Sequence, residues 1–176
     1  MAEIKVSAER EYTVRITGDW RGDLSPIASK RDRVAIIYSA TMAASMPTFN
    51  FAQSEATVIE IPDGEAGKSA TVLSYIWGKL AEAGFTRSDL IVAIGGGTVT
   101  DVAGYAAASW LRGIDWVAIP TTLAGMVDAS VGGKTGINSP YGKNLIGAFH
   151  SPNSVIVDPS WLRTLSDRDF AAGLAE

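Results

Sequence analysis

Three consecutive glycines, Gly95–Gly97, lie between the apolar segment Ile91–Ile94 and a helical pattern. Glycines at such a junction let the backbone approach a ligand closely, and the helix N-terminus adds unpaired N–H groups and a positive dipole end. A diphosphate group fits that environment. The dinucleotide fingerprint G-x-G-x-x-G is not met, because Thr100 replaces the third glycine and the region about 20 positions on holds Trp116 and Val117. The junction therefore indicates either a diphosphate contact or a plain tight turn.

A second glycine-rich stretch, residues 121–147, contains two lysines among its glycines. The pair Gly133-Lys134 suggests a Walker A motif, but Asp128 stands where that motif requires a glycine, and no clean amphipathic helix follows. We therefore exclude a P-loop NTPase. A lysine flanked by glycines can contact a phosphate or a carboxylate, or lie in a solvated turn. The stretch as a whole is expected to be either a functional loop on a rigid scaffold or a loose irregular connection.

Acidic residues precede the clearest helical pattern of the chain. The sequence Pro62-Asp63-Gly64 is a strong turn signal, and Glu65 follows it. These carboxylates can accept hydrogen bonds from ribose hydroxyls or cap the helix, and the residues alone favour capping. His150 has no partner at the spacing of a nucleophile or a metal ligand, so we expect it to be structural or solvent-facing.

Composition excludes several kinds of site. The 176 residues include no Cys and one His, which excludes disulfides, thiolate metal sites, a Cys nucleophile and any self-contained site with several His ligands. Lys and Arg number 15 against 19 Asp and Glu, and the net charge of −4 gives no electrostatic footprint for nucleic acid. The N-terminus lacks the apolar core of a signal peptide, and no apolar run approaches the roughly 20 residues of a membrane-spanning helix. We therefore expect a cytoplasmic protein that binds neither nucleic acid nor membranes.

Short β-branched runs alternate with helical patterns along the chain, which predicts an α/β fold with a largely parallel sheet. The predicted strands are Tyr12–Ile16, Arg33–Tyr38, Ala56–Ile61, Leu90–Ile94, Trp116–Ile119 and Val155–Val157. Helices are predicted over Ser69–Ala83, ended by Gly84, and from about Thr100 to Trp110. A capping pattern at Ser166 and Asp169 predicts a further helix from Asp167, about two turns before the last residue.

Taken together and in this order, the motifs closely resemble the 3-dehydroquinate synthase family of the shikimate pathway. The resemblance is dense from about residue 60 to the end of the chain and weak over the first fifty residues. The matching segments are Ile61–Glu65 with Lys68, Gly95–Asp101, Ala106–Gly113, Pro120–Leu123, Val127–Asn138, Gly142–Phe149 and Gly173–Glu176.

The resemblance implies an enzyme that converts 3-deoxy-D-arabino-heptulosonate 7-phosphate to 3-dehydroquinate and phosphate. The family uses NAD and a divalent metal, usually zinc with cobalt as the alternative, to oxidise an alcohol transiently, eliminate phosphate, reduce the ketone again and close the carbocycle. It also implies a homodimer with a Rossmann-like NAD-binding α/β domain and a C-terminal helical metal-binding domain. Residues 1–165 correspond to the first domain, and residues 166–176 to the start of the second, which is otherwise missing from the sequence.

The resemblance also assigns roles to individual residues. The positions that match NAD contacts are Asp63, Gly64, Glu65, Lys68, Gly95, Gly96, Gly97, Asp101, Thr121, Thr122, Lys134, Lys143 and Thr164. The positions that match substrate contacts or active-site groups are Lys134, Lys143, Asn144, Asp128 and Arg112, of which the last reaches a neighbouring subunit's site in the family. Glu176 matches the first metal ligand, and the other two ligands are His residues of the missing domain.

The chain departs from the family at two places. It lacks the two metal-binding histidines, so we expect the 176 residues alone to be inactive. It also has Tyr38-Ser39-Ala40 where the family often has an acidic residue for the adenosine ribose. The alternative functions are another sugar-phosphate cyclase, a metal-dependent polyol dehydrogenase of related fold and a non-catalytic NAD-binding remnant.

Overall fold

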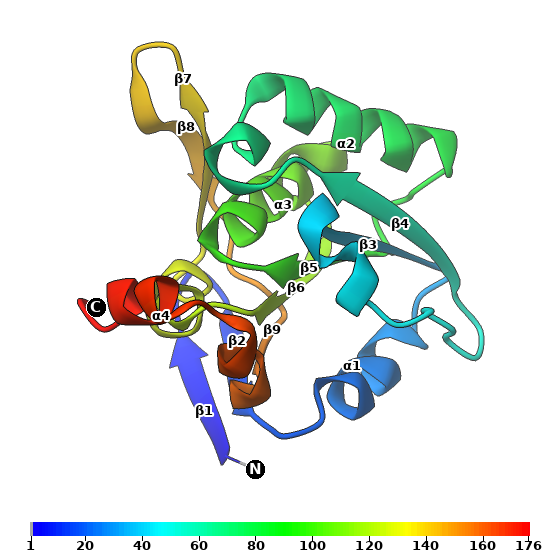
Figure 1. Ribbon diagram of the computed structural model, residues 1–176. Coiled ribbons are helices and arrows are strands. Elements are labelled where there is room, and N and C mark those ends of the chain that lie inside the picture. The colour runs from blue at the N-terminus through cyan, green and yellow to red at the C-terminus, as the bar shows by residue number, and fades with distance from the viewer. Residues whose placement is uncertain (1) are drawn as a thin grey trace.

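The continuous apolar runs of the chain form the centre of a seven-stranded sheet in the computed structural model, which describes residues 2–176 (Figure 1). β1 pairs antiparallel with β2, and every other neighbouring pair in the sheet is parallel, which confirms the predicted α/β fold. In spatial order the strands are β1 (Ala2–Ser7), β2 (Glu11–Ile16), β9 (Ser154–Val157), β6 (Asp115–Pro120), β5 (Leu90–Gly95), β3 (Arg33–Ser39) and β4 (Glu55–Ile61).

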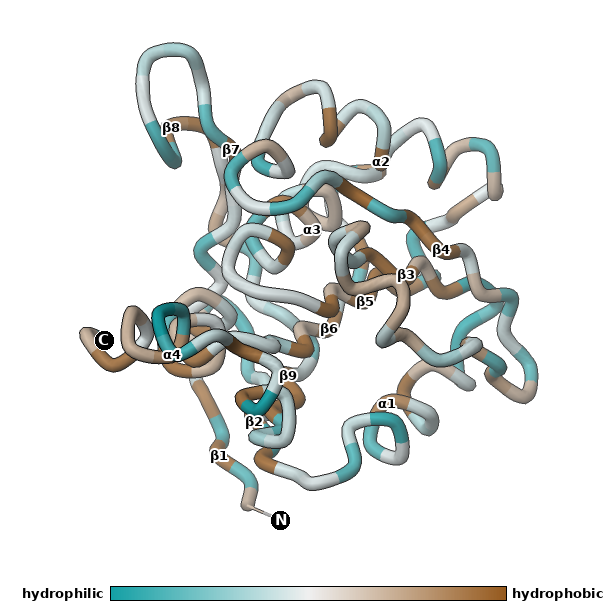
Figure 2. The backbone as a smooth tube through the Cα atoms, viewed as in Figure 1, coloured by the Kyte–Doolittle hydropathy of each residue, from teal (hydrophilic) through white to brown (hydrophobic). Residues whose placement is uncertain are grey.

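Burial explains which strands are central. Every residue of β5 is buried, and so is every residue of β3 after Arg33, because both faces of these strands are covered. Hydrophobic segments lie along β3, β5 and β6 in Figure 2, and the neighbouring strand β4 carries hydrophobic residues as well. β1 is almost wholly exposed at the edge of the sheet, and its sequence did not predict a strand.

Two of the helices begin directly after a serine that caps their first turn. α2 (Ala70–Glu82) begins after Ser69, whose hydroxyl accepts from the N–H of Val72 at 3.3 Å, and Gly84 follows it with φ of +68°. α4 (Asp167–Gly173) begins after Ser166, whose hydroxyl accepts from the N–H of Asp169 at 3.1 Å. The capping prediction at Ser166 is therefore confirmed. The expectation that Asp63 or Glu65 caps the helix of residues 69–83 is wrong, because Ser69 is its N-cap, the Asp63 side chain caps no N–H group, and Glu65 pairs with Lys143. Within residues 2–176, no helix is long and apolar enough to cross a membrane.

Two helices differ from the sequence prediction. α3 (Gly97–Ser109) begins three residues before the predicted start at Thr100, because the low helix propensity of glycine hid its first turn. α1 (Trp20–Ala28) was not predicted, since Pro26 lies inside it and argues against a helix. α3 packs against β5, β6 and α2, so its N-terminus is fixed at the carboxyl end of β5.

The prediction of a loop or loose connection over residues 121–147 is wrong for most of the stretch. A short π-helical turn, η4 (Gly125–Ala129), is followed by a hairpin of β7 (Lys134–Ser139) and β8 (Gly142–Phe149), which projects from the body of the molecule in Figure 1. Its glycines allow close strand pairing, because a Cβ on Gly147 would lie 2.1 Å from the carbonyl oxygen of Thr135. Strands that contain such glycines have little β-propensity, so the sequence pattern did not predict them.

Asp115 belongs to a charged cluster at the edge of the sheet that lies opposite the N-terminus of α3. Its carboxylate accepts from Arg31 at 2.6 Å and from Arg10 at 3.2 Å. Burial opposes its ionisation, but hydrogen bonds from Asn153, Arg31 and Arg10 outweigh burial and lower the pKa of Asp115.

Replacing Asp115 with Asn is expected to lower the free energy of unfolding by about 1–3 kcal/mol at pH 7, because it weakens hydrogen bonds to two cations. A carboxyl with a lowered pKa stabilises the fold above its unfolded value, and this stabilisation is lost as the pH falls through the folded pKa. Urea unfolding of both proteins between about pH 7 and pH 3 should therefore show the difference shrinking with acid. A difference that stays constant over this range would contradict the assignment.

Candidate functional site

Residues that follow four parallel strands surround a cavity of about 650 Å³ at the carboxyl edge of the sheet. We call it the edge cavity. In open α/β sheets, ligands bind in the crevice at this edge. It is lined by Ser39, Thr41, Met42 and Ser45 after β3, Asp63 and Gly64 after β4, Gly96, Gly97, Thr98 and Val99 after β5, Thr121 and Thr122 after β6, and Trp161, Thr164, Leu165 and Asp169 near the C-terminus.

The glycine junction forms the floor of the edge cavity. Gly96 is the N-cap of α3 and has no side chain to cap the first turn, so the N–H groups there remain available to an acceptor in the cavity. A Cβ on Gly96 would lie 2.9 Å from Cγ2 of Thr122, and one on Gly97 would lie 3.1 Å from Cβ of Ala129. Only glycine therefore lets the chain pass this closely beneath Thr122. The junction has the geometry that a diphosphate contact requires.

Trp161 and Thr164 approach the edge cavity from η5, a 3-10 helix over Pro159–Thr164. The hydroxyl of Thr164 donates to the carbonyl oxygen of Trp161 at 2.7 Å. The indole N–H of Trp161 is buried and has no hydrogen-bond partner within residues 2–176. η5 therefore contributes an aromatic ring and a hydroxyl group to the wall of the cavity.

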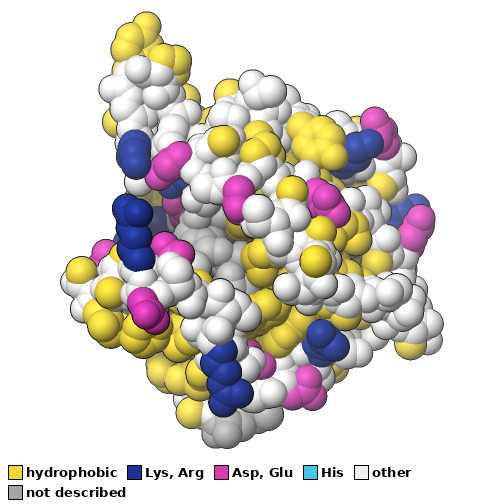
Figure 3. Space-filling model, in the orientation of Figure 1, with side chains coloured by type: hydrophobic (Ala, Val, Ile, Leu, Met, Phe, Trp, Pro, Cys, Tyr) yellow, Lys and Arg dark blue, Asp and Glu magenta, His cyan; other side chains and the backbone are white. Residues whose placement is uncertain are grey.

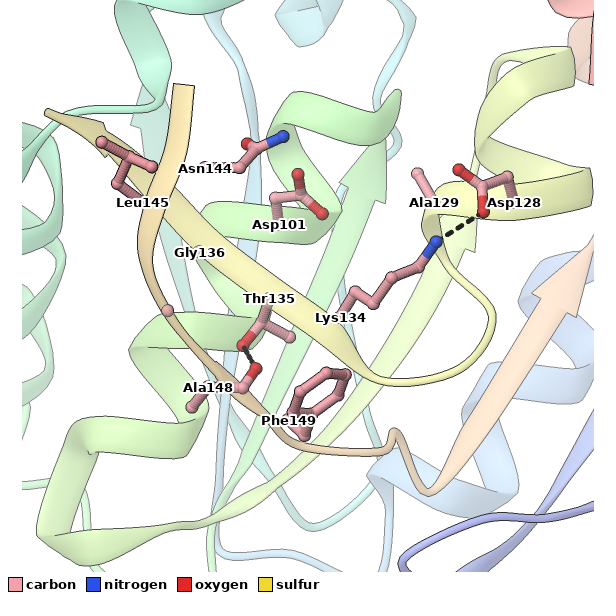
Figure 4. A pocket seen from close by; sticks show the side chains of 11 residues that line it. Asp101, Asp128, Ala129, Lys134, Thr135, Gly136, Asn144, Leu145, Ala148 and Phe149 are labelled. Atoms are coloured by element: carbon pink, nitrogen blue, oxygen red, sulfur yellow. Dashed lines mark hydrogen bonds and ion pairs between the residues drawn. The ribbon is translucent and has the colours of Figure 1, made fainter. Parts of the chain in front are cut away.

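A second cavity of about 430 Å³, the hairpin cavity, lies between α3, η4 and the hairpin β7–β8 (Figure 4). Lys134 extends across it and donates to Asp128 at 2.7 Å. The hydrogen bond to Asp128 raises the pKa of Lys134, and the charges of Asp101 and Glu176 act in the same direction. Lys134 is therefore a protonated ammonium group that faces the cavity.

Lys68 connects the acidic and amide groups of the hairpin cavity. Its side chain is nearly buried, and its ammonium group donates to both Asp101 and Asn144. Burial raises the pKa of Asp101, which the hydrogen bond from Lys68 opposes. Asn144 has φ of +57°, a left-handed conformation that Asn tolerates, and this bond holds its side chain. Lys68 therefore acts through Asp101 and Asn144, and it lines neither cavity.

The two cavities meet at the first turns of α3. Gly97 lines the edge cavity, and Asp101, one turn later on the same helix, lines the hairpin cavity. Ala129 lines the hairpin cavity and also packs against the position of Gly97. A ligand in one cavity is therefore adjacent to a ligand in the other.

The structure brings most of the expected site residues to this place. Those that line the edge cavity are Asp63, Gly64, Gly96, Gly97, Thr121, Thr122 and Thr164, and those that line the hairpin cavity are Asp101, Asp128, Lys134 and Asn144. Gly95 ends β5 directly below, where a Cβ would lie 2.5 Å from the side chain of Val99.

Besides Lys68 and Gly95, four expected residues lie outside the cavity walls. Lys143 and Glu65 form an exposed ion pair of 3.0 Å between the hairpin and η2 (Gly64–Gly67), and the hydrogen bond from Lys143 lowers the pKa of Glu65. Arg112 lies past the other end of α3, about 20 Å from Gly97 by helix length, with φ of +66°. Glu176 is exposed beyond α4. Among residues 2–176, no group of three or more His, Cys, Asp or Glu gathers closely enough to hold a metal ion.

Two other outcomes concern single residues. His150 is structural, as predicted, because its Nε2 hydrogen-bonds to the carbonyl oxygen of Ile114 at 2.9 Å. Sequence reasoning missed Thr41 and Trp161 as cavity residues. The signal that could have found Thr41 is its place directly after a predicted strand, since the carboxyl ends of parallel strands meet at one edge. Nothing in the sequence around Trp161 separates it from a core aromatic residue.

Charges on the face seen in Figure 3 are interspersed, with Lys and Arg beside Asp and Glu. No single sign of charge dominates this face, so the chemistry of the site depends on a few positioned groups. The hairpin cavity is defined by the charged groups of Lys134, Asp128 and Asp101. The edge cavity is defined by the N-terminus of α3.

Comparison with known proteins gives consistent matches over nearly the whole chain. Residues 58–172 match the family described as "3-dehydroquinate synthase N-terminal". The 3-dehydroquinate synthase of Mycolicibacterium gilvum (strain PYR-GCK) is 47% identical over 177 residues, which cover 98% of this chain and 49% of the relative. The chain spans about half the length of the curated relatives it matches.

Two solved structures are similar in fold. A 2-deoxy-scyllo-inosose synthase complexed with carbaglucose-6-phosphate, NAD+ and Co2+ superposes with a TM-score of 0.87 at 23% identity, covering 98% of this chain and 49% of that chain. The 2-epi-5-epi-valiolone synthase from Streptomyces hygroscopicus subsp. jinggangensis 5008, with NAD+ and Zn2+ bound, gives a TM-score of 0.82 at 29% identity with the same coverage.

Proposed function

We propose a function on the premise that this chain belongs to the 3-dehydroquinate synthase family. The chain is the NAD-binding half of an enzyme that converts 3-deoxy-D-arabino-heptulosonate 7-phosphate to 3-dehydroquinate and phosphate. The observation that carries the proposal is the meeting of two cavities at the start of α3, one with a bare helix N-terminus and one with a protonated lysine. The first suits a dinucleotide, and the second suits a phosphorylated substrate.

NAD fits the edge cavity. The first turn of α3 offers N–H groups to its diphosphate, and the hydroxyls of Thr121 and Thr122 after β6 and of Thr164 in η5 offer further hydrogen bonds. When bound, NAD supplies a reversible hydride acceptor for an alcohol of the substrate. The related valiolone synthase, whose structure contains NAD+, supports this choice of cofactor.

The substrate's phosphate and carboxylate suit the lysines of the hairpin region. Asp128 holds a proton on Nζ of Lys134, so this side chain presents a fixed positive charge to the cavity. Asn144, held by Lys68, adds an amide that can bond to substrate hydroxyls. Positive charge placed here would stabilise the charge that develops as phosphate leaves. Lys143 can join this group if its ion pair with Glu65 opens.

Among residues 2–176, no three His, Cys, Asp or Glu side chains gather closely enough to hold a metal ion. We propose that Glu176 supplies one carboxylate to a zinc or cobalt ion, and that its other ligands come from a helical domain that residues 166–176 begin. The related synthases with Co2+ and Zn2+ support a divalent metal. We further propose a cytoplasmic homodimer, in which Arg112 serves the neighbouring subunit's site because it is remote from both cavities of its own chain.

Another sugar-phosphate cyclase is the second candidate, since two such enzymes share the fold. The 47% identity to a 3-dehydroquinate synthase, against 29% and 23% to these cyclases, favours the first candidate. Similarity to a glycerol dehydrogenase is at 18% identity and shows the fold alone.

The protein encoded by the complete open reading frame should release one phosphate per heptulosonate phosphate, in the presence of NAD and zinc, without net NADH. Glucose 6-phosphate should not be turned over. The 176-residue chain alone should show no release, because it holds only one of the proposed metal ligands. Turnover of glucose 6-phosphate would favour the second candidate, and accumulation of NADH would favour a dehydrogenase.

A further inference from the structure

A third cavity, of about 230 Å³, lies beside α1 and shares no lining residue with the edge cavity or the hairpin cavity. We call it the aromatic pocket. One wall is α1, which contributes Trp20 and Leu24, and the other wall is the segment 47–51. Trp20 and Leu24 are buried, whereas Phe49 and Phe51 of the second wall are half-buried. The pocket therefore presents aromatic surface to a ligand.

The two walls of the aromatic pocket are held together by contacts of their own. The ring centroids of Trp20 and Phe49 lie 6.5 Å apart, and those of Phe49 and Phe51 lie 6.3 Å apart, which is the range of favourable aromatic pairs. The hydroxyl of Ser54 donates to the carbonyl oxygen of Ala28 at 2.8 Å and so ties the second wall to the end of α1. The pocket is therefore preformed, as ligand sites usually are.

The size of the aromatic pocket limits what it can hold. An apolar cavity of about 150 Å³ takes up one benzene molecule. At about 230 Å³, the aromatic pocket has room for one aromatic ring with a short substituent. It is too small for a dinucleotide or a sugar phosphate with its hydration shell.

Arg21 determines the chemistry of that substituent. Within the described chain, it is the only charged side chain that lines the pocket, and its guanidinium carbon lies 5.3 Å from the centroid of the Trp20 ring. This cation–π contact uses the face of the guanidinium and leaves its in-plane N–H groups available as donors. No ion pair joins Arg21 to an Asp or Glu of residues 2–176. A carboxylate is the planar acceptor that matches such a fork of donors.

Trp20 separates the aromatic pocket from the edge cavity. Its ring centroid lies 5.9 Å from that of Trp161, which lines the edge cavity but not the aromatic pocket. The backbone N–H groups of Trp20 and Ser160 both donate to the carboxylate of Asp158, at 3.4 and 2.9 Å, so the start of α1 is joined to η5. A ligand that packs on Trp20 therefore lies one side chain away from the edge cavity.

We propose that the aromatic pocket is a separate ligand site that binds a small aromatic carboxylate. The ring of the ligand packs among Trp20, Phe49 and Phe51, and its carboxylate accepts from the guanidinium of Arg21. An uncharged ring leaves Arg21 without its acceptor, and a saturated ring loses the aromatic pairs. The inference does not depend on the proposed function, because no residue of the edge cavity or the hairpin cavity takes part in it.

The test is titration of the native chain with phenylacetate, followed by NMR of the tryptophan indole N–H signals. The Trp20 signal is assigned by its loss in Trp20→Phe. It should shift saturably, with a dissociation constant in the millimolar range that a ligand of this size allows. Phenylacetamide has the same shape without the charge and should bind at least about tenfold more weakly. Cyclohexylacetate keeps the charge but lacks the aromatic ring, and it should bind a few-fold more weakly.

Arg21→Met should weaken the binding of phenylacetate about tenfold and leave that of phenylacetamide unchanged. Arg87→Met is the matched control, because it removes the same charge from an exposed position that lines none of the three cavities, and it should bind phenylacetate like the native chain. The inference is overturned if the Trp20 signal of the folded native chain does not move at phenylacetate concentrations well above the millimolar range. It is also overturned if phenylacetamide binds as tightly as phenylacetate, or if Arg21→Met and Arg87→Met bind phenylacetate equally.

Discussion

Replacing Gly96 with Ala is expected to weaken NADH binding about tenfold or more while the fold survives. The backbone at Gly96 has φ of −74°, which Ala adopts without strain, so the chain can still form α3. Its new Cβ would lie 2.9 Å from Cγ2 of Thr122, so Thr122 or the first turn of α3 must shift. Both face the edge cavity, and a shift that costs about 1.4 kcal/mol of binding free energy corresponds to tenfold in affinity.

The measurement is energy transfer from tryptophan to NADH, because Trp161 lines the same cavity. Gly18→Ala is the control, since a Cβ at exposed Gly18 meets nothing within 4 Å. It should bind NADH like the native chain. If Gly96→Ala also binds NADH normally, the diphosphate does not lie against this junction.

Replacing Lys68 with Met is expected to lower the free energy of unfolding by about 2–4 kcal/mol, because it leaves the partly buried Asp101 carboxylate without its buried cation. Lys143→Met removes a lysine from an exposed pair with Glu65 and should cost less than about 1 kcal/mol. Urea unfolding of the two variants makes the comparison. Equal losses would show that Lys68 does not serve as the buried partner of Asp101.

The pH dependence of Lys68→Met gives a second readout. Burial already raises the pKa of Asp101, and the loss of Lys68 removes an opposing interaction. A carboxyl with a raised folded pKa stabilises the fold below its unfolded value, and this contribution is lost as the pH rises through the folded pKa. The deficit of Lys68→Met should therefore be smaller in mild acid than at neutral pH, and Lys68→Met with Asp101→Asn should recover part of it.

The sequence predicted the elements whose signals are local. Ser166 caps a helix at the expected residue, Gly84 follows α2 as expected, and the apolar run before Gly95 is the buried strand that its composition indicated. The hairpin β7–β8 was missed, because its pairing depends on close contact between glycines rather than on β-branched residues. The edge strand β1 was missed as well, since an exposed strand has no apolar run to reveal it.

The motifs located many of the cavity-lining residues along the chain, but they missed Thr41 and Trp161 and did not give the arrangement in space. The motifs identified Asp63, Asp101 and Lys134, yet nothing in their spacing showed that they belong to two adjacent cavities. The burial of Lys68 and the bond between Thr41 and Asp63 are contacts across the sheet edge, between segments 22 or more residues apart. Such contacts depend on strand order, which no single motif encodes.

The most direct test of the account is calorimetric titration of the native 176-residue chain with NAD, with its fold verified by circular dichroism. The account predicts saturable binding of one NAD per chain, a raised melting temperature in the presence of NAD, and an affinity at least about tenfold lower in Gly96→Ala. A folded chain that gives no binding heat and no change in melting temperature at millimolar NAD would contradict the assignment of the edge cavity.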